Sequence, residues 1–450
     1  MNILTRFSSI AVAVALASNP AAAQSAPSAA DARIAAALQD VSAARIQATI
    51  EKLVSFGTRS SLSAQDPAAI KSGRGIGAAR EWIKAEFERY SRQCGGCLDV
   101  GTDAFVEGPA ERIATPTVLT NVYAVMRGTD PQNARRVVLI TGHYDSRNSD
   151  MLDVTRAAPG ANDDGSGTAA SLECARVLSR LKFPATLIFL AVAGEEQGLN
   201  GSKHFAALAR QKGWIIEAVL NNDIVGGDRN PAQNSRAVRV FSEGIPAAAD
   251  DKTLQKIRAR GAESDSTSRE LARFIAETGA LYATQVAPLL IFRPDRYLRG
   301  GDHSSFNDAG YAAVRFTEYR ENFTHQHQTI RSENGVEFGD LPKFVDFEYV
   351  ANVVRLNAAT LAALASAPAA PAEVALRTTT LENDSTLTWQ PSAGAAAYEV
   401  LWRPTTSAVW EHAQGVGNVT SATLPISKDN VIFAVRAVDA DGHRSLGAAP

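Results

Sequence analysis

Several features are scarce in this chain of 450 residues, and each scarcity excludes a class of protein. The chain has three cysteines, too few for a disulfide-rich scaffold. It has no block of basic residues, and its formal net charge is −3, so nothing indicates a nucleic-acid partner. Beyond the N-terminus, no run of about 18 apolar residues indicates a membrane span. Hydrophobic residues make up 45% and charged residues 21%, which is typical of globular domains.

The first 23 residues have the pattern of a secretory signal peptide. Arg6 is their only charged residue, and an apolar run over 10–17 follows it. Three alanines then precede Gln24 and supply the small residues of a cleavage site. An alanine-rich amphipathic start is the alternative. We therefore expect residues 1–23 to be removed and the mature chain to be secreted or periplasmic.

The cysteine spacing fits an exported protein. Cys94 and Cys97 enclose two glycines, and in an oxidising compartment they can close a small disulfide loop. A redox or metal role is the alternative, but no second cysteine pair is present to complete a zinc site. Cys174 lies in a helical pattern, where a buried small hydrophobe is expected.

Alternating strand and helix patterns predict an α/β domain with a mixed, largely parallel sheet flanked by helices. Helices are expected over 76–91, 168–181, 202–210 and 347–364. Strands are expected over 121–125, 137–140, 186–192, 218–220, 237–241, 288–292 and 312–316. The strand at 186–192 is almost continuously apolar, as expected where helices cover both faces of a sheet.

The domain boundaries follow shifts in composition and in hydrophobic period. After the leader, the expected segments are an N-terminal helical part over 24–118, the core over 119–366, an Ala- and Pro-rich linker over 367–371, and a small β-sandwich over 372–450. In that last segment, apolar residues alternate with polar ones around Trp389, Val400 and Phe433. These stretches resemble strands of a fibronectin type III-like domain.

Four short polar clusters carry the strongest functional signal, because each sits at the end of an apolar run. They are His143-Tyr144-Asp145, Asn162-Asp163-Asp164-Gly165-Ser166-Gly167, Glu195-Glu196 and Asn221-Asn222-Asp223. Each has an ordinary explanation alone, as a helix cap, a turn or an acidic first helical turn. Together they would bury several carboxylates, and bound divalent metal would neutralise that charge. The clusters therefore predict a two-metal hydrolase.

In this order, the four clusters resemble the motifs of the dizinc aminopeptidases of the aminopeptidase Y type, which include bacterial leucyl aminopeptidases. The resemblance covers about residues 119–364. It implies a zinc exopeptidase fold, two zinc ions per chain, and removal of N-terminal residues from peptides or proteins. We expect no nucleic-acid partner and no membrane span in the mature chain. The oligomeric state is left open.

Carried over by position, the resemblance assigns a role to each candidate residue. His143 and Asp223 would bind one zinc, Asp163 would bridge the two ions, and Glu196 would bind the second ion. Glu195 would be the general base, and Asp145 would orient the His143 ring.

The last zinc ligand is a histidine late in the domain, and the resemblance favours His327 over His325. The tyrosine that often precedes this histidine in the family is replaced by Gln326, so the oxyanion stabiliser is not identified. Asp302 and His303 resemble a family segment that lines the site.

Three other functions remain open on the same scaffold. A carboxypeptidase would need a cationic pocket, which Arg293, Arg296 and Arg299 could supply. A glutaminyl cyclase typically uses a single zinc, which five ligand positions argue against. A non-catalytic binding relative would have lost the metal, although the candidate histidines and carboxylates are all present.

Overall fold

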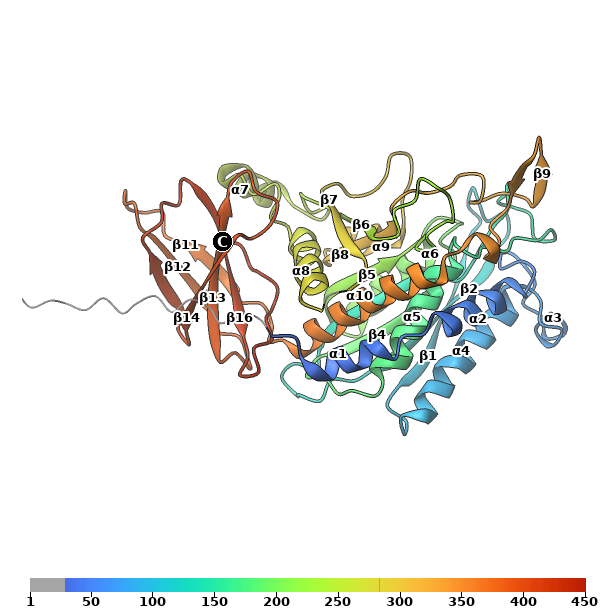
Figure 1. Cartoon of the computed structure of the whole chain (residues 1–450), viewed down its shortest axis with the longest axis horizontal. Helices are drawn as coiled ribbons and strands as arrows, with labels where there is room; N and C mark the ends of the chain where they lie inside the picture. Colours follow the sequence, from blue (N-terminus) through green and yellow to red (C-terminus); the bar gives the residue numbers. More distant parts are fainter. Residues whose placement is uncertain (1–28, 283) are drawn as a thin grey trace, which may run out of the picture.

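The computed structural model describes residues 29–282 and 284–450, so the expected signal peptide over 1–23 lies outside the described residues. An eight-stranded mixed sheet forms the centre of the molecule, in the order β1-β2-β4-β3-β5-β8-β6-β7 (Figure 1). Its strands are β1 (Asp99–Glu107), β2 (Thr117–Met126), β3 (Arg136–His143), β4 (Thr186–Val192), β5 (Ile215–Asn222), β6 (Ala237–Ser242), β7 (Ala287–Ile291) and β8 (Ala313–Glu318). Strands β4, β3, β5 and β8 run parallel, while β1, β2 and β6 each pair antiparallel with a neighbour. The expected mixed, largely parallel sheet is confirmed.

Helices cover both faces of this sheet. The helices are α1 (Ala32–Gln39), α2 (Ala43–Val54), α3 (Pro67–Lys71), α4 (Gly75–Gln93), α5 (Gly165–Leu178), α6 (Asn200–Gln211), α7 (Asp251–Arg260), α8 (Thr267–Leu281), α9 (Asp302–Asp308) and α10 (Phe347–Ser366), with a 3-10 turn η1 (Pro342–Phe344). Alternate residues of β3 enter two different cores. Val138 and Ile140 pack in the core that holds α5 and α10, whereas Val137 and Leu139 pack in the core that holds α6 and α9. Both faces of β3 are therefore buried, which explains the apolar run over residues 137–140.

The sequence predicts a helical N-terminal part over residues 24–118, but this part of the structure also contains a strand. Strand β1 lies within it and pairs antiparallel with β2. Only Asp103 of its nine residues is buried, so the strand lacks the apolar alternation by which strands are recognised. The sequence does not predict helix α7 for a similar reason: none of its residues is buried, so burial imposes no apolar face on it.

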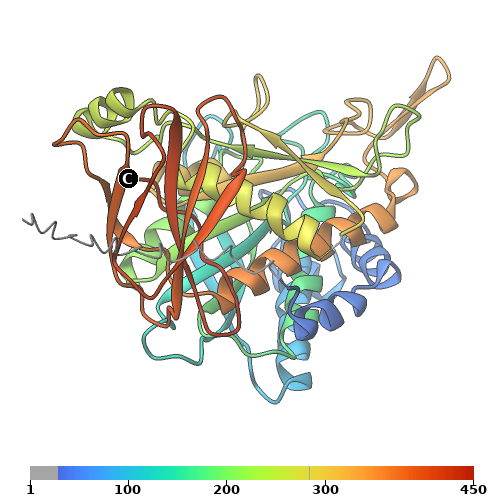
Figure 2. The same ribbon diagram turned by 60° about the vertical axis from the view of Figure 1, so that its left-hand side comes forward.

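Two three-stranded antiparallel sheets follow α10 and form what we term the C-terminal module, residues 372–450 (Figure 2). One sheet has the order β11-β12-β15 and the other β14-β13-β16. The strands are β11 (Ala372–Leu376), β12 (Ser385–Gln390), β13 (Ala397–Pro404), β14 (His412–Gly417), β15 (Ser421–Leu424) and β16 (Val431–Val438), and a separate hairpin pairs β9 (Arg331–Glu333) with β10 (Val336–Phe338). Trp389 of β12 packs with Tyr398 and Val400 of β13 in one core between the two sheets. The fibronectin type III-like assignment stays a prediction.

The C-terminal module is attached to α8 through polar contacts. Trp410 donates a 2.8 Å hydrogen bond to Glu270, and Arg273 donates one of 2.7 Å to the carbonyl of Ala408. Burial raises the pKa of Glu270 to about 7, although Arg273 beside it opposes that rise.

The three cysteines have different environments. Cys94 and Cys97 form a disulfide at the end of α4, as expected. Cys174 is a free thiol buried in α5. Among the described residues, no helix combines the length and hydropathy needed to cross a bilayer.

Candidate metal centre

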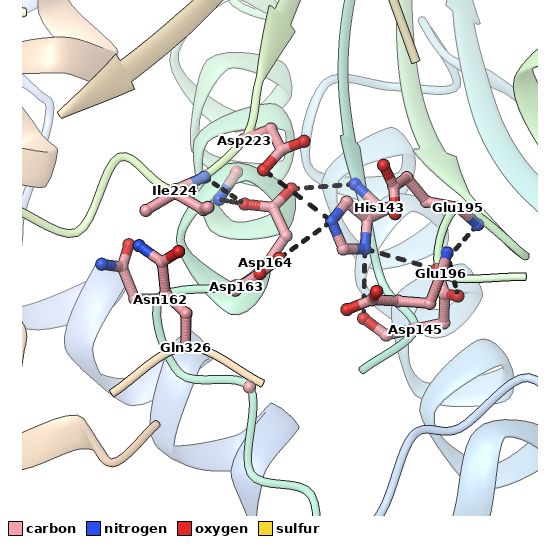
Figure 3. Close-up of polar contacts among 12 residues, drawn as sticks. His143, Asp145, Asn162, Asp163, Asp164, Glu195, Glu196, Asp223, Ile224 and Gln326 are labelled. Carbon is pink, nitrogen blue, oxygen red and sulfur yellow. Dashed lines mark hydrogen bonds and ion pairs between the residues drawn. The ribbon is translucent and has the colours of Figure 1, made fainter. Parts of the chain in front are cut away.

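Three of the four polar clusters meet at one edge of the sheet because they follow neighbouring parallel strands (Figure 3). His143 is the last residue of β3, Asp223 directly follows β5, and the Glu195-Glu196 pair follows β4. The fourth cluster differs from the expectation of a strand end. Asp163 lies at the end of a long loop, two residues before the start of α5. The carboxyl ends of parallel strands are the usual ligand-binding edge of an α/β sheet.

His143, Glu195 and Asp223 form the first group of candidate ligands. Each offers one donor atom, and these atoms lie within 4.8 Å of one another. Nε2 of His143 also lies 3.2 Å from Oδ1 of Asp163 and 4.0 Å from Oδ1 of Asp223. Asp163 therefore adjoins the first group.

Asp163, Glu196 and His327 form the second group, with the same 4.8 Å limit between their donor atoms. Nε2 of His327 lies 2.8 Å from Oδ2 of Asp163 and 2.9 Å from Oε1 of Glu196. The two oxygens of Asp163 thus face different histidines. A carboxylate placed in this way can contact two ions at once.

Three buried atoms at the junction of the two groups have no hydrogen-bond partner among residues 29–282 and 284–450. They are Nε2 of His143, Oδ2 of Asp163 and Oε1 of Glu196. Nε2 of His327 approaches the last two of these atoms without satisfying hydrogen-bond geometry, and leaving buried polar atoms incompletely bonded is costly. Imidazole nitrogen and carboxylate oxygen are donors that zinc accepts. The residues present therefore fit a divalent metal such as zinc.

Asp145 connects the His143 ring to the Glu195-Glu196 turn. Nδ1 of His143 lies 3.4 Å from Oδ1 of Asp145 and 3.2 Å from its backbone oxygen. The carboxylate of Asp145 accepts hydrogen bonds from the backbone N–H groups of Glu195 and Glu196, at 3.3 and 3.2 Å. One buried side chain thus orients residues of both candidate groups.

Asp164 acts as a helix cap, which is the ordinary explanation for this cluster. Its carboxylate accepts hydrogen bonds of 2.9 Å from the backbone N–H groups of Gly167 and His143. Because Asp164 caps the helix, the carboxylate of Asp163 is free to face the metal centre. Asp340, which the sequence did not indicate, holds the same loop by accepting from the backbone N–H groups of Asn162 and Asp163 at 2.8 and 2.7 Å.

The concentration of carboxylates favours positive charge at the centre. Burial lowers the pKa of His327, but Glu196 and Asp163 outweigh it and raise that pKa to about 10. Burial, reinforced by Glu196, raises the pKa of Glu195 well above its ordinary value. Burial also opposes ionisation of Glu196, yet His327 holds its pKa below the ordinary range.

Two arginines contact the candidate ligands directly and were missed from the sequence. Nε of Arg147 lies 2.9 Å from Oε2 of Glu196. Nη2 of Arg315 lies 2.7 Å from Oδ1 of Asp223, and Nη1 lies 3.3 Å from Asp295. Arg147 follows Asp145 by two positions, but no local pattern reveals that it reaches Glu196.

The other candidate histidines point elsewhere. His325 forms an ion pair with Asp228 and stacks on the ring of Phe344, with centroids 3.6 Å apart. His303 is buried, and its Nε2 lies 2.9 Å from the carbonyl oxygen of Pro294. Neither belongs to the two groups of candidate ligands.

A cavity of about 300 Å³ opens beside both groups. Its lining comprises Arg112, Arg147, Asp163, Glu195, Glu196, Gly198, Leu199, Asp223, Arg296, Leu298, Arg299, Gly300, Arg315 and His327. Asp302 and His303, which were expected to line the site, are not part of this wall. Both are buried beneath it at the start of α9.

Comparison with known proteins agrees with this geometry. The sequence model described as Peptidase family M28 matches residues 121–334. A protein of Pyricularia oryzae named a probable zinc metalloprotease is 47% identical over 436 residues, covering 93% of this chain and 84% of that protein. The chain belongs to peptidase family M28. It is therefore a zinc metallopeptidase.

Solved structures share the fold of this M28 peptidase at low sequence identity. LapB from Legionella pneumophila superposes with a TM-score of 0.51 at 20% identity, covering 74% of each chain. An aminopeptidase from Aneurinibacillus sp. strain AM-1 has a TM-score of 0.50 at 16% identity, covering 73% of this chain and 95% of that one. These similarities concern the fold.

Proposed function

We propose that this M28 peptidase is a dizinc aminopeptidase that removes N-terminal residues from peptides or proteins. The observation that carries the proposal is Asp163, whose two carboxylate oxygens face His143 on one side and His327 on the other. A shared carboxylate between two sets of buried donors is the arrangement that a two-metal hydrolase requires.

Each ligand in the proposal comes from a separate segment of the chain. His143 and Asp223 would hold one zinc, Glu196 and His327 would hold the other, and Asp163 would be shared between the two groups. Asp145 orients the His143 ring and keeps its Nδ1 directed away from the metal. Zinc bound here would polarise the scissile carbonyl and lower the pKa of a water molecule towards about 7.

Glu195 is the proposed general base. It lines the cavity, and its carboxylate lies within 4.8 Å of donor atoms of His143 and Asp223, so it borders the place where the attacking water would be held. Glu195 would take a proton from the attacking water and then give it to the leaving amine. Neighbouring Glu196 keeps a different role because His327 favours its ionised form.

The size of the cavity supports an exopeptidase. About 300 Å³ is at the small end for ligand pockets and suits one or two residues better than a long peptide. The aminopeptidase named among the structural neighbours supports the N-terminal specificity.

A carboxypeptidase is the second candidate, and one feature of the cavity wall favours it. Arg296 and Arg299 line the cavity, as a pocket for a substrate carboxylate would require. Arg293, the third residue considered for that role, lies outside the lining and stacks on Tyr297, 3.8 Å from the ring centroid.

We also propose that the chain is exported. The pattern over residues 1–23 supports a secretory leader. The disulfide between Cys94 and Cys97 is of the kind that persists in oxidising compartments.

Hydrolysis of a panel of aminoacyl-nitroanilides, together with metal analysis, tests the proposed function. We expect two zinc ions per chain, release from substrates with a free α-amine, and no release from their N-acetylated counterparts. Cleavage of the N-acetylated substrates at equal rates would overturn the aminopeptidase assignment. Absence of bound zinc after reconstitution would overturn the metal centre.

A further inference from the structure

The cavity beside the metal centre contains more positive charge than the proposed chemistry uses. Five arginines line it, together with the carboxylates of Asp163, Glu195, Glu196 and Asp223. All four carboxylates already have roles as metal ligands or as the general base. The wall therefore has no acidic side chain left over for recognition of the substrate.

Three of the five arginines are neutralised by partners within the protein. Arg147 pairs with Glu196 and Arg315 with Asp223. Arg296 pairs with Asp295 and with Glu321.

Arg112 and Arg299 have no such partner. Within the described part of the chain, no carboxylate oxygen lies within 4.0 Å of either guanidinium. Arg112 donates through Nη1 to the backbone oxygen of Glu196 at 3.0 Å, and Arg299 donates through Nη2 to Oε1 of Gln326 at 3.5 Å. Both side chains are half-buried. A guanidinium carries five N–H donors, so each retains several that no protein group takes up.

The anchors of these two arginines locate them in the site. Arg112 is held at Glu196, and Arg299 is held at the residue next to His327. Glu196 and His327 are themselves 2.9 Å apart and belong to the same group of ligands. The two unpaired guanidiniums thus border the part of the cavity where the second metal ion would bind.

We propose that Arg112 and Arg299 form a subsite that binds a carboxylate of the substrate. A planar guanidinium matches a carboxylate with two parallel hydrogen bonds, and partial burial strengthens the pairing. The proposal rests on the proposed exopeptidase function and specifies its substrate class. Two carboxylates can lie next to a scissile bond at a chain end: an aspartate or glutamate side chain, or the C-terminal carboxylate.

Paired substrates that differ only in one carboxylate test the subsite in the zinc-loaded enzyme. Glutamyl- and glutaminyl-nitroanilide form the first pair. An N-blocked dipeptide with a free C-terminus and its C-terminal amide form the second pair. We expect kcat/KM to favour the carboxylate member of one pair by at least about tenfold, which is the scale of a buried charge pair. The first pair reports an acidic N-terminal residue, and the second reports a C-terminal carboxylate.

Variants connect that preference to the two residues. We expect Arg112→Gln and Arg299→Gln each to reduce the preference by about tenfold, chiefly through KM. Arg299→Lys keeps the charge and should restore part of the preference. Arg293→Gln is the matched control, because Arg293 belongs to the same loop but stacks on Tyr297 outside the cavity lining. It should leave the preference as in the wild type.

Binding of free amino acids provides a second readout that does not depend on turnover. In calorimetric titrations, glutamic acid α-amide, which has only the side-chain carboxylate, or glutamine, which has only the α-carboxylate, should bind more tightly than glutaminamide, which has neither, and Arg112→Gln should remove the difference. Equal hydrolysis of the two nitroanilides, with no preference for the free C-terminus in the second pair, would overturn the subsite and leave the proposed aminopeptidase function standing. A preference in the second pair would support the subsite and favour the carboxypeptidase over the aminopeptidase. If no substrate were hydrolysed, the proposed function would fall, and equal binding of glutamic acid α-amide, glutamine and glutaminamide would then overturn the subsite as well.

Discussion

The hydroxyl of Ser61 donates a 2.9 Å hydrogen bond to Oδ2 of Asp145, and both side chains are buried. Asp145 in turn contacts the His143 ring and the backbone of Glu195 and Glu196. Ser61 thus reaches the proposed metal ligands through one intermediate. It comes from the loop after α2, far from the motifs in sequence.

Replacing Asp145 should weaken zinc binding without removing a ligand. Groups that orient metal-bound histidines typically contribute about 10- to 100-fold in affinity. We expect a loss of that size for Asp145→Ala and a smaller one for Ser61→Ala, measured by competition with a zinc chelator. Equal zinc affinity in Asp145→Ala and the wild type would contradict the orienting role.

Glu195→Gln should abolish proton transfer and keep the metal. We expect kcat to fall by at least about 100-fold, the lower range for loss of a general base, while zinc content stays at the wild-type value. Glu196→Gln is the contrasting variant, because it should lose zinc as well as activity. Turnover by Glu195→Gln at the wild-type rate would remove the base assignment.

The two late histidines should separate in a metal assay. His327→Ala removes a donor that lies within 3 Å of both Asp163 and Glu196, so about half of the bound zinc should be lost on dialysis. His325→Ala disturbs an ion pair with Asp228 and should retain both ions. The reverse pattern would transfer the ligand role to His325.

Thiol titration should reveal the three cysteines in stages. The native enzyme should react with no thiol reagent, because Cys174 is buried and the other two form a disulfide. Unfolding without reductant should expose one thiol, and unfolding after reduction should expose three. Two or more thiols in the unreduced, unfolded chain would show that the disulfide does not form.

The stability of the protein should depend on pH through Glu270. Its pKa is about 7 in the folded state and close to 4.5 when unfolded, so the folded state holds the proton more tightly. The stabilisation is complete below about pH 4.5 and is lost as the pH rises through about 7. The glutamine side chain of Glu270→Gln is uncharged at every pH, so this variant should not lose stability in this way as the pH rises.

The measurement for Glu270 is the difference in unfolding free energy between the variant and the wild type. We expect that difference to shift in favour of Glu270→Gln by up to about 3 kcal/mol between pH 4.5 and pH 7.5, from 1.36 kcal/mol per pKa unit. The difference cancels pH effects that arise at the metal centre. If the unfolding free energies of the variant and the wild type changed equally between pH 4.5 and pH 7.5, the raised pKa of Glu270 would be contradicted.

The clusters that the structure brings together at the proposed metal centre could be selected from the sequence because each carries its own local signal. Glu195 and Asp223 follow apolar strands closely, and topology then brings parallel strand ends together. Ser61, Arg315 and Asp340 could not be found in this way. Each contacts the centre from a segment whose sequence reads as an ordinary loop or strand, and only the tertiary fold reveals the contact.

The same distinction applies to the fold. The strand over Thr186–Val192 was predictable because burial on both faces imposes a continuous apolar sequence. Strand β1 and helix α7 were missed because solvent covers most of their surface and constrains few residues. The module beyond α10 was detectable by its change of period, but its contacts with α8 depend on charged residues that follow no period.

Asp340 fixes the backbone of Asp163 from a position 177 residues later in the chain. A ribosome therefore completes most of the catalytic domain before the loop that presents Asp163 can be held in place. Until His327 and Asp340 have been synthesised, a nascent chain has all three donors of the first group, but the second group lacks His327. Proteolytic loss of this late segment would likewise remove His327 and the support that Asp340 gives to Asp163, so we expect cleavage there to inactivate the enzyme even if the central sheet remained intact.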